Sequence, residues 1–132
     1  RCAFNGPDDN LLCTVSLVEL IARPEVYDGR LVKVVGWLHL EFEGDALYLH
    51  REDHERAIPM NALRFSAPES FRSRSDEFND SYCLVMGVFT AYPAGFSPLE
   101  RGGVDAAYVM RLPQSIEEWQ GVTTFTEWSA SP

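Results

Sequence analysis

Two histidines and a glutamate near the middle of the chain carry the side chains that divalent metal ions prefer. His39 and His50 lie in two segments that alternate apolar and polar residues, and Glu41 follows His39 by two positions. Two imidazole nitrogens and one carboxylate oxygen suit zinc with an open fourth position, so His39, His50 and Glu41 are a candidate metal site. The same residues also suit an ordinary polar sheet face on which histidines and carboxylates hydrogen-bond to one another. Glu, Asp and His at 52–54 extend this polar segment.

Two aromatic residues share the predicted face with these histidines. Trp37 and Tyr48 alternate with apolar residues in the same two segments. Stacked aromatics on a sheet face bind single-stranded nucleic acid where basic residues hold the phosphate backbone. The neighbours here include Glu41 and Glu43, so a protein or peptide with a basic surface fits this face better. A second interpretation is that Trp37 packs beneath the N-terminal helix or the C-terminal tail.

Composition and charge narrow the classes of function. The 132 residues carry 11 Lys plus Arg against 20 Asp plus Glu, which gives a net charge of −9. Such a chain repels phosphates, because nucleic-acid binding depends on neutralised phosphates and released counterions. The sequence has no run of 18 apolar residues, so we expect no membrane span. It also has no nucleophile elbow and no glycine-rich phosphate loop, so we predict a protein that is not an enzyme and uses no cofactor.

The candidate residues depend on one long strand and a hairpin. The stretch 31–43 alternates apolar residues at even positions with Trp37, His39 and Glu41 at odd positions, and this period of two predicts a strand. A straight strand of this length would span roughly 43 Å, so it must bend, and Gly36 is the expected kink or bulge. A two-residue turn at 44–45 would place Glu41 opposite Tyr48 and His39 opposite His50.

The remaining elements follow from caps, prolines and alternation. Ser16 with Glu19 predicts a capped helix at 16–23 that Pro24 ends, and Ser66 with Glu69 predicts a second capped helix reaching Asn79. We also predict strands at 61–66, 82–92 and 105–112, a loop at 93–104 and a short helix at 115–119. Strand 82–92 is apolar on both faces and is therefore expected to be deeply buried.

This order of elements predicts the fold class. Three strands, a helix and two further strands make a mainly β chain with the order of a five-stranded OB-fold-like Greek-key barrel, preceded by an N-terminal helix. The predicted organisation is a flexible or disulfide-tied arm at 1–13, the barrel at 14–112, and a C-terminal helix and tail at 113–132. The sequence shows no domain linker between these parts.

One stretch of the chain resembles a known group of proteins. The run SLVELIARPEVYDGRLVKVVGWLHLEFEGDALYLHRED, from Ser16 to Asp53, is similar to a small bacterial family of uncharacterised OB-fold-like proteins, and the similarity is closest over 16–54. A weaker likeness continues through YCLVMGVF at 82–89. The resemblance implies the barrel and carries no activity, while the 93–104 loop departs from the short segment expected in that family.

Three cysteines leave the compartment open. Cys2 and Cys13 flank a polar loop at a spacing that allows a disulfide, and Cys83 lies in an apolar run typical of a core thiol. A bridge between Cys2 and Cys13 would indicate a periplasmic or secreted protein, and free thiols would indicate a cytoplasmic one.

The function expected from the sequence is therefore non-catalytic binding. We predict recognition of a protein or peptide partner, with a basic surface, through the face that carries Trp37, His39, Glu41, Tyr48 and His50. An inhibitor- or immunity-type protein that blocks a basic enzyme is one version of this function. The alternatives are binding of a single-stranded oligonucleotide, which the charge disfavours, and binding of zinc at His39 and His50.

Overall fold

A closed β-barrel forms the centre of the molecule. The structure, a computed structural model, describes residues 2–5, 10–93, 95–96 and 99–130. Three consecutive strands pair antiparallel as β3–β4–β5, β5 pairs in parallel with β7, β7 pairs antiparallel with β6, and β6 returns to β3. The expected closed five-stranded Greek-key barrel is therefore confirmed. Its strands are β3 (Leu31–His39), β4 (Ala46–Tyr48), β5 (Ala62–Ser66), β6 (Ser81–Ala91) and β7 (Gly102–Arg111).

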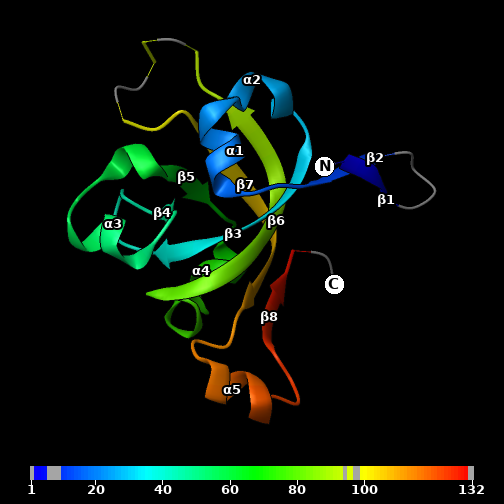
Figure 1. The fold of residues 1–132 in the computed structure, drawn as a ribbon, viewed down its shortest axis with the longest axis vertical. Coiled ribbons are helices and arrows are strands. Elements are labelled where there is room, and N and C mark those ends of the chain that lie inside the picture. The colour runs from blue at the N-terminus through cyan, green and yellow to red at the C-terminus, as the bar shows by residue number, and fades with distance from the viewer. Residues whose placement is uncertain (1, 6–9, 94, 97–98, 131–132) are drawn as a thin grey trace.

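Among the described residues, three further strands lie outside the barrel (Figure 1). The hairpin of β1 (Cys2–Asn5) and β2 (Asn10–Thr14) projects from one side, and β2 pairs in parallel with the first residues of β3. The third, β8 (Thr126–Ser129), pairs antiparallel with β7. Arg1 and the tip of the predicted arm, at 6–9, lie outside the described residues. No helix in the described part of the chain is long and apolar enough to cross a membrane.

The helices are short and lie around the barrel (Figure 1). Ser16 caps the first helix by accepting a hydrogen bond from the Glu19 backbone, as predicted, and Ser115 caps the last helix in the same way. The helices are α1 (Leu17–Ala22), α2 (Pro24–Tyr27), α3 (Arg51–Glu55), α4 (Glu69–Arg72) and α5 (Ile116–Gly121), with single 3₁₀ turns η1 (Pro59–Asn61) and η2 (Ser75–Glu77).

The helix between the third and fourth barrel strands is present but shorter than predicted. α4 ends at Arg72 and η2 follows, so the helix predicted to reach Asn79 is wrong in length. Ser66 is not its cap, because its hydroxyl donates to Asp105. Only Phe71 and Phe78 are buried on this segment. A helix in a protein is stabilised mainly by packing of its apolar face, and two buried side chains support two short turns instead of one continuous helix.

The long first strand is also shorter than predicted. β3 ends at His39, and residues 40–45 form a loop instead of a strand end with a two-residue turn. Trp37 pairs with Tyr48 and His39 with Ala46, so the predicted pairing of His39 with His50 is wrong by four residues. No bulge interrupts β3 at Gly36, which stays paired with Cys83, and the register shift lies at Met86/Gly87 between β6 and β7.

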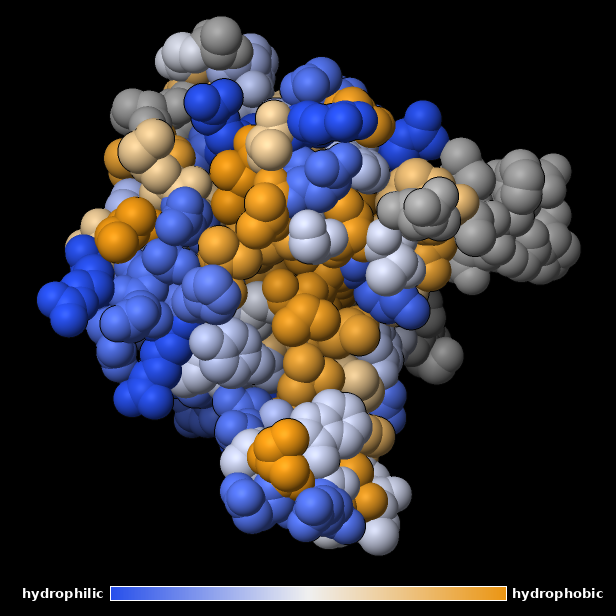
Figure 2. All heavy atoms as spheres, in the orientation of Figure 1, coloured by the Kyte–Doolittle hydropathy of each residue, from blue (hydrophilic) through white to orange (hydrophobic). Residues whose placement is uncertain are grey.

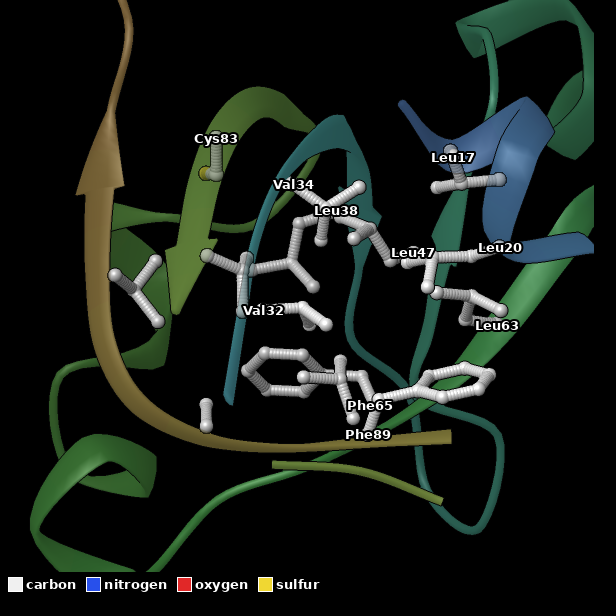
Figure 3. Close-up of a cluster of buried hydrophobic side chains, with 14 of the residues drawn as sticks. Leu17, Leu20, Val32, Val34, Leu38, Leu47, Leu63, Phe65, Cys83 and Phe89 are labelled. Carbon is white, nitrogen blue, oxygen red and sulfur yellow. The ribbon is translucent and has the colours of Figure 1, made fainter. Parts of the chain in front are cut away.

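The barrel interior is filled by the inward positions of all five strands (Figure 3). Val32, Val34 and Leu38 of β3 are fully buried, as are the inward residues of β6. α1 closes one end of the barrel, because Leu17 and Leu20 pack into the same core. The core extends beyond the barrel to Trp128 of β8, which is buried opposite Val109.

The N-terminal hairpin is tied by a disulfide. Cys2 and Cys13 lie opposite each other in β1 and β2 and form a disulfide, one of the two alternatives that the sequence left open. Cys83 is a free, fully buried thiol, as expected of a core cysteine. Burial raises the pKa of the Cys83 thiol to about 11, so this sulfur stays protonated and unreactive at neutral pH.

Candidate functional site

Four of the five predicted site residues gather at one end of β3. Trp37 and Tyr48 face each other on neighbouring strands, as expected for residues on one face. His39 ends the strand and Glu41 lies in the loop that follows it. His50 does not join them, because it begins α3 and keeps 67% of its side chain exposed.

Trp37 is not an open aromatic platform. Only 8% of the residue is exposed, and the guanidinium of Arg51 lies 5.7 Å from the ring centroid. The Tyr82 ring meets it edge-on at 5.1 Å, and the Tyr82 hydroxyl accepts a hydrogen bond from the backbone N–H of Arg51. α3 therefore covers the tryptophan, which is buried as the second interpretation expected, although under a different element. Among the described residues, the buried Nε1 of Trp37 has no acceptor.

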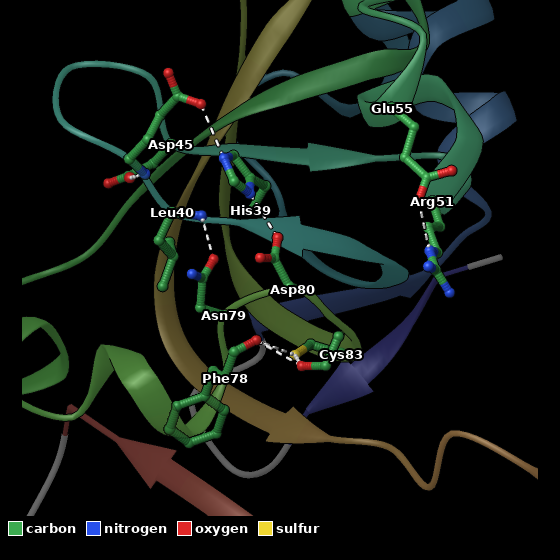
Figure 4. Close-up of polar contacts among 11 residues, drawn as sticks. His39, Leu40, Asp45, Arg51, Glu55, Phe78, Asn79, Asp80 and Cys83 are labelled. Atoms are coloured by element: carbon green, nitrogen blue, oxygen red, sulfur yellow. Dashed lines mark hydrogen bonds and ion pairs between the residues drawn. The ribbon is translucent and has the colours of Figure 1, made fainter.

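His39 is held between two carboxylates. Its Nδ1 lies 2.5 Å from an Asp80 oxygen, and its Nε2 lies 2.8 Å from Oε1 of Glu41 (Figure 4 shows the Asp80 contact). Only 15% of the His39 side chain is exposed. With both ring nitrogens occupied, the orientation of the imidazole is fixed on both sides.

The histidine that joins this group is His54 rather than His50. The His54 ring stacks on His39 with centroids 3.8 Å apart, and the Tyr48 ring meets His54 edge-on at 5.4 Å. One donor atom from each of His39, Glu41 and His54 lies within 4.8 Å of the other two. We call these three residues and Asp80 the histidine cluster. The only signal for His54 in the sequence is its place in the polar stretch after the hairpin.

Local hydrogen bonds position both sides of the histidine cluster. Asp53 is buried, and its carboxylate accepts from the backbone of His50 and the side chain of Asn61, which fixes α3 against the loop that follows it. The other side is fixed by Asn79, whose amide oxygen accepts from the backbone of Leu40 (Figure 4), and by the Asp80 N–H, which donates to Leu38.

A groove lies next to this cluster. It has a volume of about 740 Å³ and is bounded by the 40–45 loop, β5 and α4. Phe42 stands at its edge with 90% of its surface exposed, between Glu41 and Glu43. Arg72 of α4 crosses to Asp45 and pairs with it, so the loop is tied to the far wall of the groove.

A second surface, not predicted from the sequence, lies on the outer face of the barrel. The strand register places Val35, Leu84 and Met110 in one row across β3, β6 and β7, and Lys33, Met86 and Tyr108 in the next. Val35 and Val88 each keep 46% of their surface exposed. Figure 2 shows hydrophobic side chains gathered down the middle of this view. We call the following residues the apolar band: Leu31, Val35, Leu84, Met86, Val88 and Met110.

The exposure of the apolar band differs from the deep burial that the sequence predicted for both faces of β6. Its inward side chains Cys83, Val85 and Phe89 are fully buried, but the outward ones are half-buried or exposed. The deep burial predicted for both faces is therefore wrong for the outer face. The sequence showed two apolar faces, and only one of them packs against the core.

Burial, together with neighbouring carboxylates, raises the pKa of two tyrosines, Tyr48 and Tyr108. Burial raises the pKa of the Tyr48 phenol, with further contributions from the charges of Glu41 and Glu100, so Tyr48 is neutral at physiological pH. Burial, together with a hydrogen bond to Glu127, raises the pKa of Tyr108 to about 12. Neither phenol supplies a nucleophile at neutral pH.

Comparison with known proteins gives no information on the function of this chain. Neither a scan against models of protein families nor a search of curated proteins finds a match for this chain. The similarity to a bacterial family therefore remains a prediction from the sequence.

Proposed function

We propose that this chain is a non-catalytic, OB-fold-like binding module that recognises a basic protein or peptide partner on the outer face of β3, β6 and β7. The observation that carries the proposal is the apolar band, which runs across three strands with Val35 and Val88 about half exposed. The strand order and α4 between β5 and β6 support the OB-fold-like assignment.

The make-up of the apolar band favours a macromolecular partner. Contiguous apolar surface on a soluble domain is typical of interaction sites, and methionines such as Met86 and Met110 adapt to the shape of a partner. The band is a sheet surface rather than an enclosed pocket, which suits a protein or peptide better than a small molecule. Trp37 and Tyr82 continue the same face towards the histidine cluster.

The net charge of the chain indicates the sign of the partner's charge. The net charge of −9 opposes association of two copies and opposes phosphate-rich ligands, while it speeds encounter with a basic surface. Asp105 and Glu127 lie beside the apolar band, opposite Val88 and Met110. An inhibitor of a basic enzyme is one protein of this kind.

A displayed library of random peptides, selected against the full chain, tests the proposal. We expect the enriched peptides to combine Lys or Arg with apolar residues, and to lose at least tenfold in affinity, about 1.4 kcal/mol, for Val35→Lys and Val88→Lys. Val35→Glu should lose less affinity than Val35→Lys, because a basic partner tolerates a carboxylate better.

Val18→Lys is the matched control, since Val18 is exposed to a similar degree but lies on α1. Equal weakening by Val18→Lys and Val35→Lys would contradict the proposed surface. Two other results would overturn the proposed partner. The first is that the chain sediments as a dimer and that Val35→Lys converts this dimer to monomers. The second is that the chain binds an oligothymidylate probe with an affinity that falls steeply as salt rises.

A further inference from the structure

We propose that His39, His54 and Glu41 form a binding site for a divalent first-row transition-metal ion. Zinc is the ion used to test this site. These residues come from the end of β3, from α3 and from the 40–45 loop, and one donor atom of each lies within 4.8 Å of the others. The proposal is independent of the partner surface, because it does not use the apolar band.

The donor set fits this class of ion. Two imidazole nitrogens and one carboxylate oxygen suit zinc, iron, nickel and cobalt, whereas magnesium and calcium take oxygen ligands. Ligands at zinc distances stand about 3.3 Å apart in a tetrahedral site, so the 2.8 Å contact between Nε2 of His39 and Oε1 of Glu41 must open slightly. Glu41 can move, since it lies in a loop with 57% of its side chain exposed.

Asp80 supplies the outer shell that a metal-bound histidine requires. It accepts a hydrogen bond from Nδ1 of His39, so Nε2 is the nitrogen that faces Glu41 and that would exchange this contact for the ion. A carboxylate behind a ligating imidazole fixes the tautomer and raises the basicity of the ligand. Asp80 adopts a φ of 55°, a left-handed conformation, and its N–H donates to Leu38, so it is held at the end of β3.

His54 is held in place independently of any ion. The buried carboxylate of Asp53 fixes the start of α3, and the Arg51 N–H donates to the Tyr82 hydroxyl on β6. The Tyr48 ring supports the His54 imidazole from its edge. The fold thus places the backbone of His54, but its ring stacks on His39 at an interplanar angle of 29°. An imidazole binds a metal ion in its ring plane, so the His54 side chain must turn before its nitrogen points at the ion.

The cysteines offer no competing ligand. Cys2 and Cys13 are joined in the disulfide, and the Cys83 thiol is fully buried. The chain has three histidines, His39, His50 and His54. Replacing His50 and His54 one at a time therefore distinguishes the pair of His39 and His54 from the two pairs that include His50.

Calorimetric titration of the full chain with zinc chloride, without reductant, tests the site. We expect one ion per chain, and at least tenfold weaker binding in His39→Gln, His54→Gln and Glu41→Gln. Asp80→Asn should weaken binding by about tenfold, because it removes the outer-shell charge while asparagine tolerates the left-handed conformation. A long-range ¹H–¹⁵N spectrum should show zinc shifting ring nitrogens of His39 and His54 and leaving those of His50 unchanged.

His50→Gln is the matched control and should bind zinc like the parent chain. Equal loss in His50→Gln and His54→Gln would overturn the proposal, because it would assign the ion to His54 of α3 and His50, the residue that caps this helix. Absence of binding in the parent chain would also overturn it. Glu41→Gln remains informative if a histidine variant fails to fold, since Glu41 lies exposed in a loop.

Discussion

Replacing Gly36 with alanine tests a close approach between two barrel strands, β3 and β4. A Cβ at this position would lie 2.7 Å from the carbonyl oxygen of Tyr48, 2.8 Å from Cγ of Leu47 and 3.1 Å from Cδ1 of Leu17. Carbon atoms in contact prefer about 3.5–4.0 Å, so β4 and α1 must both withdraw by roughly half an ångström or more.

The expected cost follows from this crowding. Overpacking a filled core costs about 1–3 kcal/mol, and alanine recovers part of that by restricting the unfolded chain. We expect a net loss of about 2 kcal/mol in the free energy of unfolding, which for a chain of this length lowers Tm by roughly 6–10 °C.

Urea unfolding followed by tryptophan fluorescence measures this loss as a lower midpoint at unchanged slope. Gly121→Ala is the matched control, because a Cβ at Gly121, the last residue of α5, meets no atom within 4 Å. If Gly36→Ala unfolds at the same midpoint as the parent chain, the packing described for β3, β4 and α1 is refuted.

Two further predictions concern groups whose pKa the fold raises. Because burial raises the pKa of Cys83 to about 11, a disulfide-exchange reagent at pH 8 should find no reactive thiol in the folded chain and one after denaturation. A folded chain that releases one equivalent at once would contradict this burial. The pKa of Tyr108 is raised from 10.0 to about 12, so its stabilising contribution is full below pH 10 and is lost as pH rises towards 12, where only the unfolded phenol ionises readily. Tyr108→Phe should therefore lose less stability than the parent chain between pH 10 and 12 in urea unfolding, and equal losses would argue against this role for Tyr108.

The barrel could be predicted because its signals are local and repeated. Alternation marked β3 and a run apolar on both faces marked β6, and Ser16 and Ser115 marked two helix starts that the structure confirms. The end of β3 could not be predicted in the same way. Leu40 and Phe42 continue the alternation, but Phe42 is 90% exposed in a loop, because no neighbouring strand covers it.

For the candidate site, the sequence predicted which residues share one face of the strands, but it did not predict α3, which covers this face. α3 formed in a stretch of Arg, Glu, Asp and His residues that has no apolar periodicity, so its position over Trp37 left no signal in the sequence. Asp53 accounts for this placement, since its buried carboxylate fixes the start of α3 through contacts with residues on either side of it.

The difference between face and register explains which site residues were found. A period of two determines which side of the sheet a residue occupies, whereas the length of the connecting loop determines which residue lies opposite. The pairing of β3 with β4 departs from the predicted one by four residues, an even number, so Trp37, His39 and Tyr48 keep their common face while the pairing of His39 with His50 is lost. A shift of four also releases residues 40–45 as a loop, and that loop brings Glu41 back to Nε2 of His39. The displaced register therefore removed one histidine from the predicted cluster and left room beside His39 for another, His54, which stacks on it.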